Sequence, residues 1–249
     1  MSPAPSSVVI TCEHGGNQVP KEYRAVFSGA RDVLRSHRGW DPGALAVGKA
    51  LARATDAPFV FATVTRLLVD LNRTKDGSGR FSEFSRSLSE DERTRILKEY
   101  YEPHWTVVRT TIAAALRAAA RNKERPDEVF HVASHSFTAE PGKISGRARP
   151  KRPYEVGLLF DPSRSRERSF AEQWRRAILR SDPDVQVMMN RPYRGWTDGM
   201  TTVFRTEFGP AYVGIELECN QAVLAQPESL SRLRRVLCST LPAAVAHTH

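Results

Sequence analysis

Cysteine is scarce in this sequence, and the spacing of its cysteines matches neither a metal-binding motif nor a disulfide framework. The 249 residues include three cysteines, Cys12, Cys219 and Cys238, which lie far apart and form no C-x-x-C pair. A disulfide-stabilised scaffold and a cysteine zinc knot are therefore excluded. An odd number of scattered cysteines predicts a protein of a reducing compartment, the cytoplasm.

Long apolar runs are also missing. No stretch approaches the roughly 18 apolar residues that a membrane helix needs. The amino-terminus lacks the basic segment and apolar run that are typical of a signal peptide. We therefore expect neither a membrane segment nor a cleaved leader.

Nucleotide-binding motifs are absent as well, since the sequence contains no G-x-G-x-x-G and no Walker motif. The formal net charge is +9, but the Lys and Arg residues are scattered, with the densest groups around residues 147–152 and 164–168. Neither group is part of a recognised nucleic-acid module with interleaved aromatic residues. The sequence therefore does not favour a nucleic-acid partner.

What the chain does have is a composition suited to a packed core. It is 40% hydrophobic and 26% charged, with both signs mixed. One compact domain over residues 1–249 is the natural expectation at this length. Residues 1–7 are expected to be frayed, and the basic, Gly- and Pro-rich stretch 141–153 to be a mobile loop.

Apolar runs and turn signals predict alternating strands and helices. We expect strands over residues 8–12, 58–65, 129–133, 156–160, 185–189 and 212–219, and helices over 42–55, 89–122, 169–179 and 228–246. Ser89, followed three residues later by Glu92, fits a capping box at the start of the second helix. The alternation and the lack of internal repeats predict an α/β fold with a largely parallel sheet.

Polar side chains stand at the ends of several predicted strands. His14 follows the first strand and His135 follows the third, while Glu216 and Glu218 share one face of the last strand. Ionised carboxylates are rarely buried without a partner, so this face requires a cation, a metal or an opening to water. Salt bridges to arginine are the alternative for either glutamate.

Histidine and carboxylate groups are the ligands that catalytic zinc prefers. His14 and His135 at the same edge of one sheet favour such a site, although a histidine at a strand end also serves structural roles. Asp41 stands just before a predicted helix. The sequence leaves open whether Asp41 is an N-cap or a third metal ligand.

A second polar group follows the apolar run that ends at Val69. Asp70, Asn72 and Arg73 are close together here, and Arg66 precedes them. The planar guanidinium of arginine matches a carboxylate with two hydrogen bonds, and a cation also stabilises an oxyanion. An ordinary polar turn with an ion pair to Asp70 is the alternative.

Seven short blocks occur in an order that resembles one known family, the N-formylglutamate amidohydrolases. The blocks are CEHGGN (12–17), GWDPGA (39–44), RLLVDLNR (66–73), SHSF (134–137), GLLFDP (157–162), NRPYRG (190–195) and GIELECNQ (214–221). The resemblance covers about residues 8–222. It implies a three-layer α/β/α fold with a mostly parallel mixed sheet, similar to the zinc carboxypeptidase and aspartoacylase group.

The resemblance also implies one zinc ion bound by His14, Asp41 and His135. The carboxypeptidase group has a glutamate three residues after its first histidine, whereas this chain has Asn17. The carboxylate ligand must then come from elsewhere. Asp41 is the first choice and Glu13 the second.

By the same resemblance Glu218 is the general base, preferred to Glu216 because it lies nearer the end of its strand. Arg66 would stabilise the oxyanion. Residues expected to bind substrate carboxylates are Asn72 and Arg73, with Arg194 and Arg205 as weaker candidates.

The resemblance predicts a metal-dependent amidohydrolase that cleaves the amide of a small N-acyl amino acid. N-formyl-L-glutamate, giving formate and L-glutamate, is the first substrate expected. A different N-acyl amino acid or a related amide is the alternative. A non-catalytic or nucleic-acid-binding protein on the same fold is less favoured.

Overall fold

The structure is a computed structural model that describes residues 7–121, 127–142 and 150–248. Most of the predicted frayed segment 1–7 and most of the predicted mobile loop 141–153 lie outside the described residues.

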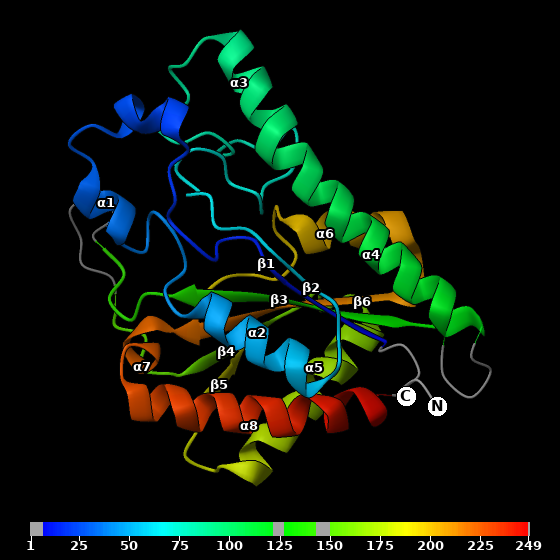
Figure 1. Cartoon of the computed structure of the whole chain (residues 1–249). Helices are drawn as coiled ribbons and strands as arrows, with labels where there is room; N and C mark the ends of the chain where they lie inside the picture. The colour runs from blue at the N-terminus through cyan, green and yellow to red at the C-terminus, as the bar shows by residue number, and fades with distance from the viewer. Residues whose placement is uncertain (1–6, 122–126, 143–149, 249) are drawn as a thin grey trace.

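A six-stranded sheet with the order β2-β1-β3-β6-β4-β5 forms the centre of the molecule (Figure 1). The strands are β1 (Val8–Cys12), β2 (Phe59–Phe61), β3 (Val129–Phe137), β4 (Val156–Leu159), β5 (Val187–Met189) and β6 (Tyr212–Asn220). Neighbouring strands are parallel except β4 and β6, which are antiparallel. The predicted mostly parallel mixed sheet is confirmed.

Helices cover both faces of this sheet (Figure 1). One face packs against α4 (Glu102–Arg121) and α6 (Met200–Phe208), and the other against α2 (Ala44–Ala54), α5 (Ser165–Ser181) and α8 (Pro227–Ala246). Alternation along β1 serves both layers, since Val9 packs on the α4 side and Ile10 on the α8 side. The fold therefore has the three predicted α/β/α layers.

Shorter elements connect these layers. They are η1 (Lys21–Phe27), α1 (Arg31–Arg35), α3 (Glu90–Ile96), η2 (Leu97–Tyr101), η3 (Gly209–Ala211) and α7 (Gln221–Leu224). The capping box is confirmed, because the Ser89 hydroxyl accepts from the Glu92 backbone N–H and the Glu92 carboxylate accepts from the Ser89 N–H. The single helix predicted over 89–122 is three consecutive segments, η2 being a π-helical turn. No helix was predicted from the sequence at α6.

The predicted end of the third strand at residue 133 is wrong, because β3 continues through residues 134–136 to Phe137. Strand β3 pairs with β6 as far as Phe137, opposite Asn220. The hydroxyl of Ser134 donates to the Ala44 carbonyl, and the hydroxyl of Ser136 donates to the Pro42 carbonyl. These partners let polar side chains remain in a buried strand, so His135 is held by a sheet instead of a loop.

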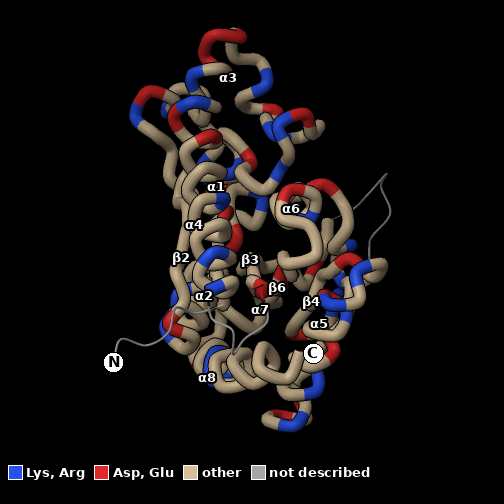
Figure 2. The backbone as a smooth tube through the Cα atoms, turned by 90° about the vertical axis from the view of Figure 1, so that its right-hand side faces the viewer, with Lys and Arg blue, Asp and Glu red and all other residues tan. Residues whose placement is uncertain are grey.

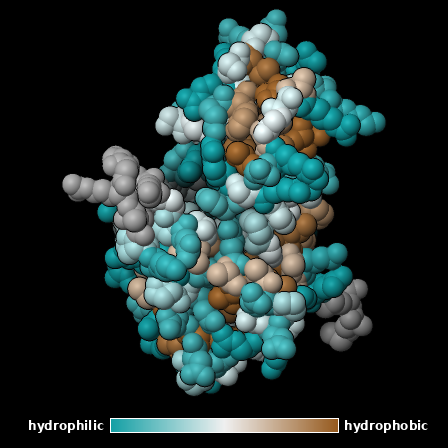
Figure 3. Space-filling model, turned by 90° about the vertical axis from the view of Figure 1, so that its left-hand side faces the viewer, coloured by the Kyte–Doolittle hydropathy of each residue, from teal (hydrophilic) through white to brown (hydrophobic). Residues whose placement is uncertain are grey.

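Charge and hydropathy are unevenly placed on this framework. In Figure 2, acidic residues lie at the centre of the molecule on β6, while Lys and Arg are spread over the surrounding helices. The face in Figure 3 is mainly hydrophilic, with hydrophobic residues gathered in its upper part. No helix among the described residues is both long and apolar enough to span a membrane.

Two glycines allow the loop after β1 to run against the chain that follows β2. A Cβ on Gly15 would lie 2.8 Å from the Ala62 carbonyl oxygen, and one on Gly16 would lie 2.7 Å from the Thr63 carbonyl oxygen. These distances are shorter than non-bonded atoms tolerate. The close approach fixes the chain immediately after His14.

Replacing Gly16 with Ala should destabilise the protein by about 1–3 kcal/mol, the usual cost of inserting a methyl group into packed structure. Denaturant unfolding measures this change. Gly142→Ala is the matched control, because a Cβ there meets nothing within 4 Å. Equal stabilities of the two variants would contradict the close-approach account.

Candidate metal centre

Three segments far apart in the sequence meet at the carboxyl end of β1. The backbone N–H of Asp41 donates to the His14 carbonyl at 2.9 Å, and the N–H of Arg66 donates to the Gly39 carbonyl at 3.1 Å. His135 enters from the carboxyl half of β3, which lies beside β1. Ligands commonly bind at this end of the strands in open α/β sheets.

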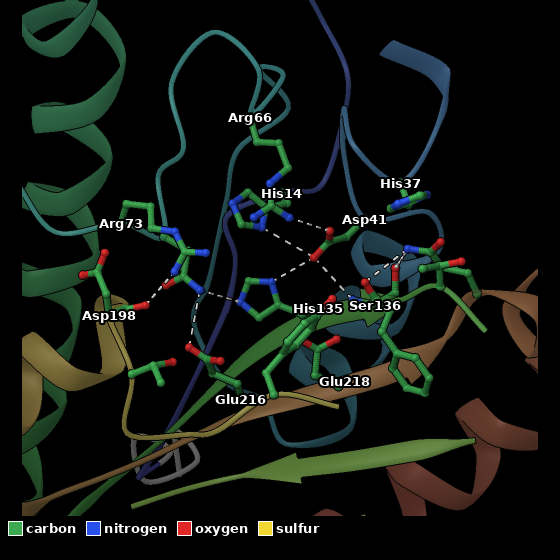
Figure 4. Close-up of a pocket in the computed structure, with 16 residues that line it drawn as sticks. His14, His37, Asp41, Arg66, Arg73, His135, Ser136, Asp198, Glu216 and Glu218 are labelled. Atoms are coloured by element: carbon green, nitrogen blue, oxygen red, sulfur yellow. Dashed lines mark hydrogen bonds and ion pairs between the residues drawn. The ribbon is translucent and has the colours of Figure 1, made fainter. Parts of the chain in front are cut away.

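His14, Asp41 and His135 form one buried group (Figure 4). Asp41 Oδ2 lies 3.5 Å from His14 Nδ1 and 2.9 Å from His135 Nδ1. One potential ligand atom from each residue lies within 4.8 Å of the other two. The structure therefore brings together the three ligands predicted from the sequence.

The outer nitrogen of each histidine already has a carboxylate partner. His14 Nε2 lies 2.7 Å from Asp70 Oδ1, and His135 Nε2 lies 3.1 Å from Glu13 Oε2. Carboxylates placed behind metal-binding histidines fix the ring and its tautomer in this way. His14 Nδ1 is buried and has no hydrogen-bond partner among the described residues. The donor set fits a divalent metal ion bound through the Nδ1 atoms and Asp41.

This geometry bears on the two carboxylates that the sequence left open. Asp41 lies between the two histidines, whereas Glu13 lies behind His135 and outside the candidate ligand group. Asp41 is also not the N-cap of α2, a place taken by Gly43. Asp41, and not Glu13, therefore belongs to the group of residues that could hold a metal ion.

The electrostatics of the group suit a cation. Burial alone would lower the pKa of His135, but hydrogen bonds to Asp41 and Glu13 outweigh it and raise that pKa well above its ordinary value. Burial would likewise raise the pKa of Asp41, but the charge of His14 and the hydrogen bond to His135 hold it well below its ordinary value. Two buried carboxylates around His135 therefore create a negative site that a proton or a metal ion neutralises.

Glu218 and Glu216 both line the cavity beside His135, but their carboxylates differ in the hydrogen bonds that they accept. Glu216 Oε1 accepts from the Asn72 side-chain amide at 3.3 Å and from the Thr201 hydroxyl at 3.4 Å. Glu218 is 5% exposed, and its Oε2 is buried with no hydrogen-bond partner in the part of the chain that the structure describes. Burial raises the pKa of Glu218 to about 8, and the charges of Asp41 and Glu216 add to the effect.

Arg66 connects two of the acidic groups. Its Nη1 donates to Asp41 Oδ1 at 3.2 Å, and its Nη2 donates to Asp70 Oδ2 at 2.8 Å. The ion pair with Asp70 that the sequence offered as an alternative is therefore present. Arg66 also lines the cavity, so it holds Asp41 in place and presents positive charge to a ligand.

Asn72 and Arg73 both line the cavity, but their side chains differ in the hydrogen bonds that they make within the protein. The Asn72 Oδ1 accepts from the Met200 N–H at 2.8 Å, and its amide N–H groups face Glu216 and His135. Arg73 donates from Nη1 to the Asp198 carbonyl at 2.8 Å, its Nε lies 4.0 Å from Asp70 Oδ2, and its side chain lines the cavity. Arg73 is consequently the freer of the two for a carboxylate.

Arg194 and Arg205 are not among the residues that line this cavity. Arg205 is buried, and it donates to the Glu167 carboxylate and to two backbone carbonyls. Arg194 is exposed, with its guanidinium 5.8 Å from the centre of the Trp196 ring. The structure does not bring either arginine to the site with the other predicted residues.

The cavity has a volume of about 200 Å³ and a mostly polar lining (Figure 4). Beyond the residues already described, it is lined by His37, Ser136, Phe137, Thr138, Tyr193, Thr197, Asp198 and Gln221. Sequence reasoning assigned none of these a role. Four of them, Ser136, Phe137, Tyr193 and Gln221, stand in blocks that carried the family resemblance, which is the signal that could have pointed to them.

The fold and this site define a three-layer α/β/α protein with a candidate metal centre. A model of the N-formylglutamate amidohydrolase family matches residues 6–225, and the chain belongs to that family. No curated protein matches the chain.

Among solved structures, the chain is similar to the gene product Atu2144 from Agrobacterium tumefaciens, with 28% identity and a TM-score of 0.77 over 98% of this chain and 92% of that chain. It is also similar to the N-formylglutamate amidohydrolase from Ralstonia eutropha JMP134, with 17% identity and a TM-score of 0.71 over 98% of this chain and 94% of that chain. The second likeness shows a shared fold.

Replacing Asp41 with Asn should weaken zinc binding by more than about 100-fold, because even an outer partner of a ligand is worth about 10–100-fold. Competition with a chromophoric chelator measures the affinity. Asp182→Asn is the control, since Asp182 pairs with Arg232 away from the cavity. Wild-type affinity in the Asp41 variant would contradict the assigned ligand group.

Proposed function

We propose that this protein is a metal-dependent amidohydrolase that cleaves the amide of an N-acyl amino acid. N-formyl-L-glutamate is the substrate we put first, giving formate and L-glutamate. One observation carries the proposal: a buried carboxylate with an unpartnered oxygen, Glu218, lines the same cavity as the His14–Asp41–His135 group.

His14, Asp41 and His135 would hold the metal, and zinc suits two imidazoles and one carboxylate. When bound there, zinc would lower the pKa of a water from about 15.7 to roughly 7 and polarise the substrate carbonyl. Asp70 and Glu13 lie against the outer nitrogen of each histidine, so the Nδ1 atoms, which face Asp41, would be the ones left to bind the metal.

Glu218 is the proposed general base. Its carboxylate accepts a proton from the water that attacks the amide carbon and returns it to the nitrogen of the leaving amine. The water oxygen is retained in the released acid, and the C–N bond breaks. A pKa raised toward neutrality by burial suits a group that both takes and gives back a proton.

Arginines supply the remaining charge in this proposal. Arg73, which lines the cavity, pairs with the carboxylate of the amino-acid half of the substrate. Arg66 stabilises the negative charge that develops on the amide oxygen. Asn72 is less available to the substrate carboxylate than Arg73, because its side-chain N–H donates to Glu216 and its Oδ1 accepts from the Met200 N–H.

Glu218→Gln should keep zinc affinity but lower kcat for N-formyl-L-glutamate by about 10²–10⁴-fold, the usual contribution of a general base. Steady-state kinetics on zinc-loaded protein measure the change. Glu216→Gln is the comparison, and its loss should be smaller because Glu216 is tied to Asn72 and Thr201. The reverse order of losses would transfer the role to Glu216.

Arg73→Met should raise KM roughly 10- to 100-fold, since a hydrogen bond to a charged group is worth ~1.5–3 kcal/mol. The same substitution at exposed Arg194 is the matched control and should leave KM unchanged. A rise in KM for the Arg194 variant alone would contradict the cavity assignment.

A different acyl group or amino acid remains the alternative within the same class. A panel of N-formyl, N-acetyl and larger N-acyl amino acids, assayed with the zinc-loaded protein, distinguishes the substrates. Hydrolysis of none of them, together with no stoichiometric metal, would overturn the proposal and favour a non-catalytic protein on this fold.

A further inference from the structure

Asp198, in the loop just before α6, is hydrogen-bonded to the segment that carries Arg73 (Figure 4). Arg73 Nη1 donates to the Asp198 carbonyl at 2.8 Å, and the backbone N–H of Thr74 donates to Asp198 Oδ1 at 3.1 Å. Asp198 therefore holds one side chain through its backbone, and the next backbone group through its side chain. The Asp198 carboxylate lines the same cavity as Arg73 but takes no part in the proposed reaction.

The turn that follows Arg73 closes directly against this carboxylate. The Gly77 N–H donates to the Thr74 carbonyl at 3.0 Å, which closes residues 74–77 into a turn. A Cβ on Gly77 would collide with Asp198 Oδ2 and would lie 2.8 Å from Thr74 Oγ1. Because non-bonded atoms do not tolerate such distances, the turn fits against the carboxylate only with a glycine at this position.

The residues that follow Asp198 hold neighbouring groups of the cavity. The Met200 N–H donates to Asn72 Oδ1 at 2.8 Å, and the Thr201 hydroxyl donates to Glu216 Oε1 at 3.4 Å. These bonds join the start of α6 to β6 and to the loop that carries Asn72. The Asp198 carbonyl therefore lies beside a regular element, from which it can orient a side chain of the facing loop.

The side chain of Arg73 is only partly covered by the protein. It is 36% exposed, and its Nε lies 4.0 Å from Asp70 Oδ2, which is beyond hydrogen-bond distance. Within the described residues, the Asp198 carbonyl is the acceptor that the Arg73 guanidinium reaches at hydrogen-bond distance. Ordering a long side chain before a ligand arrives reduces the entropy lost on binding, so this bond favours the capture of a carboxylate.

We propose that Asp198 is a positioning residue that orients the Arg73 guanidinium for a carboxylate of the substrate. Its own carboxylate fixes the turn 74–77 through Thr74, and its carbonyl fixes Arg73 Nη1. Removal of the Asp198 carboxylate releases the turn that follows Arg73 and so loosens the guanidinium. The inference rests on the proposed function, because it takes Arg73 as the partner of the substrate carboxylate.

Asp198→Ala tests this arrangement, because it removes the acceptor of the Thr74 N–H and leaves the backbone carbonyl in place. Asp198→Asn keeps an oxygen acceptor for the same N–H. Asp161→Ala is the matched control, since Asp161 Oδ1 also accepts a backbone N–H, that of Ser163 at 2.9 Å, and Asp161 does not line the cavity. Any general loss of stability from deleting such an acceptor should be shared by both alanine variants.

Two measurements on the full chain read the effect. Steady-state kinetics on zinc-loaded protein give KM and kcat for N-formyl-L-glutamate in Asp198→Ala, in Arg73→Met and in the double variant. ¹⁵N relaxation of the Arg73 Nε–H group, whose signal is assigned by its loss in Arg73→Met, gives the order parameter of this side chain without substrate.

We expect Asp198→Ala to raise KM roughly threefold to tenfold, the usual worth of one hydrogen bond, with little change in kcat. The order parameter of the Arg73 Nε–H group should fall. Asp198→Asn should restore both values, and Asp161→Ala should match the wild type. The double variant should have the KM of Arg73→Met alone, because the effects of residues that act through one another do not add.

An unchanged KM or an unchanged order parameter in Asp198→Ala would overturn the inference, and so would increases in KM that multiply in the double variant. If Arg73→Met leaves KM unchanged, or if the protein cleaves no N-acyl amino acid, it is the proposed function that fails. The order parameter alone then decides whether Asp198 holds Arg73.

Discussion

The buried contact between Asp41 and the two imidazoles is the interaction on which the site depends. Asp41 Oδ2 lies within 3.5 Å of both His14 Nδ1 and His135 Nδ1. These residues come from three segments, and their mutual charge holds the carboxyl ends of β1 and β3 and the turn before α2 together. A buried carboxylate is costly without a cation nearby. The contact that joins these three segments therefore also forms a group that could hold a metal ion.

The sheet makes this concentration of charge possible. Strands β3 and β6 pair in register from Val129 opposite Tyr212 to Phe137 opposite Asn220, which sets His135 beside Glu218. Near the carboxyl ends of these strands, polar side chains such as His135 and Glu218 line a cavity, whereas Val132 and Ile215 in the same strands pack in the core. Glu218 gains its raised pKa from this position.

The sequence predicted the framework better than the details that complete the site. Alternation and strand ends identified His14, His135 and the glutamates of β6, because those signals are local. The family resemblance brought Asp41 into the group. The position of Glu13 behind His135 was not predictable, since it depends on how the strands pair and on the exact path of the loop after β1. Arg205 was predicted to bind substrate but does not line the cavity. The sequence could not show this, because its buried partner Glu167 lies 38 residues away along the chain.

The most direct test of the account is the position of a bound zinc ion. Anomalous diffraction at the zinc edge from zinc-loaded crystals locates the ion and identifies its ligand atoms. The account predicts one ion bonded to the Nδ1 atoms of His14 and His135 and to a carboxylate oxygen of Asp41. An ion elsewhere in the molecule, or one bonded through Nε2 of either histidine, would contradict it.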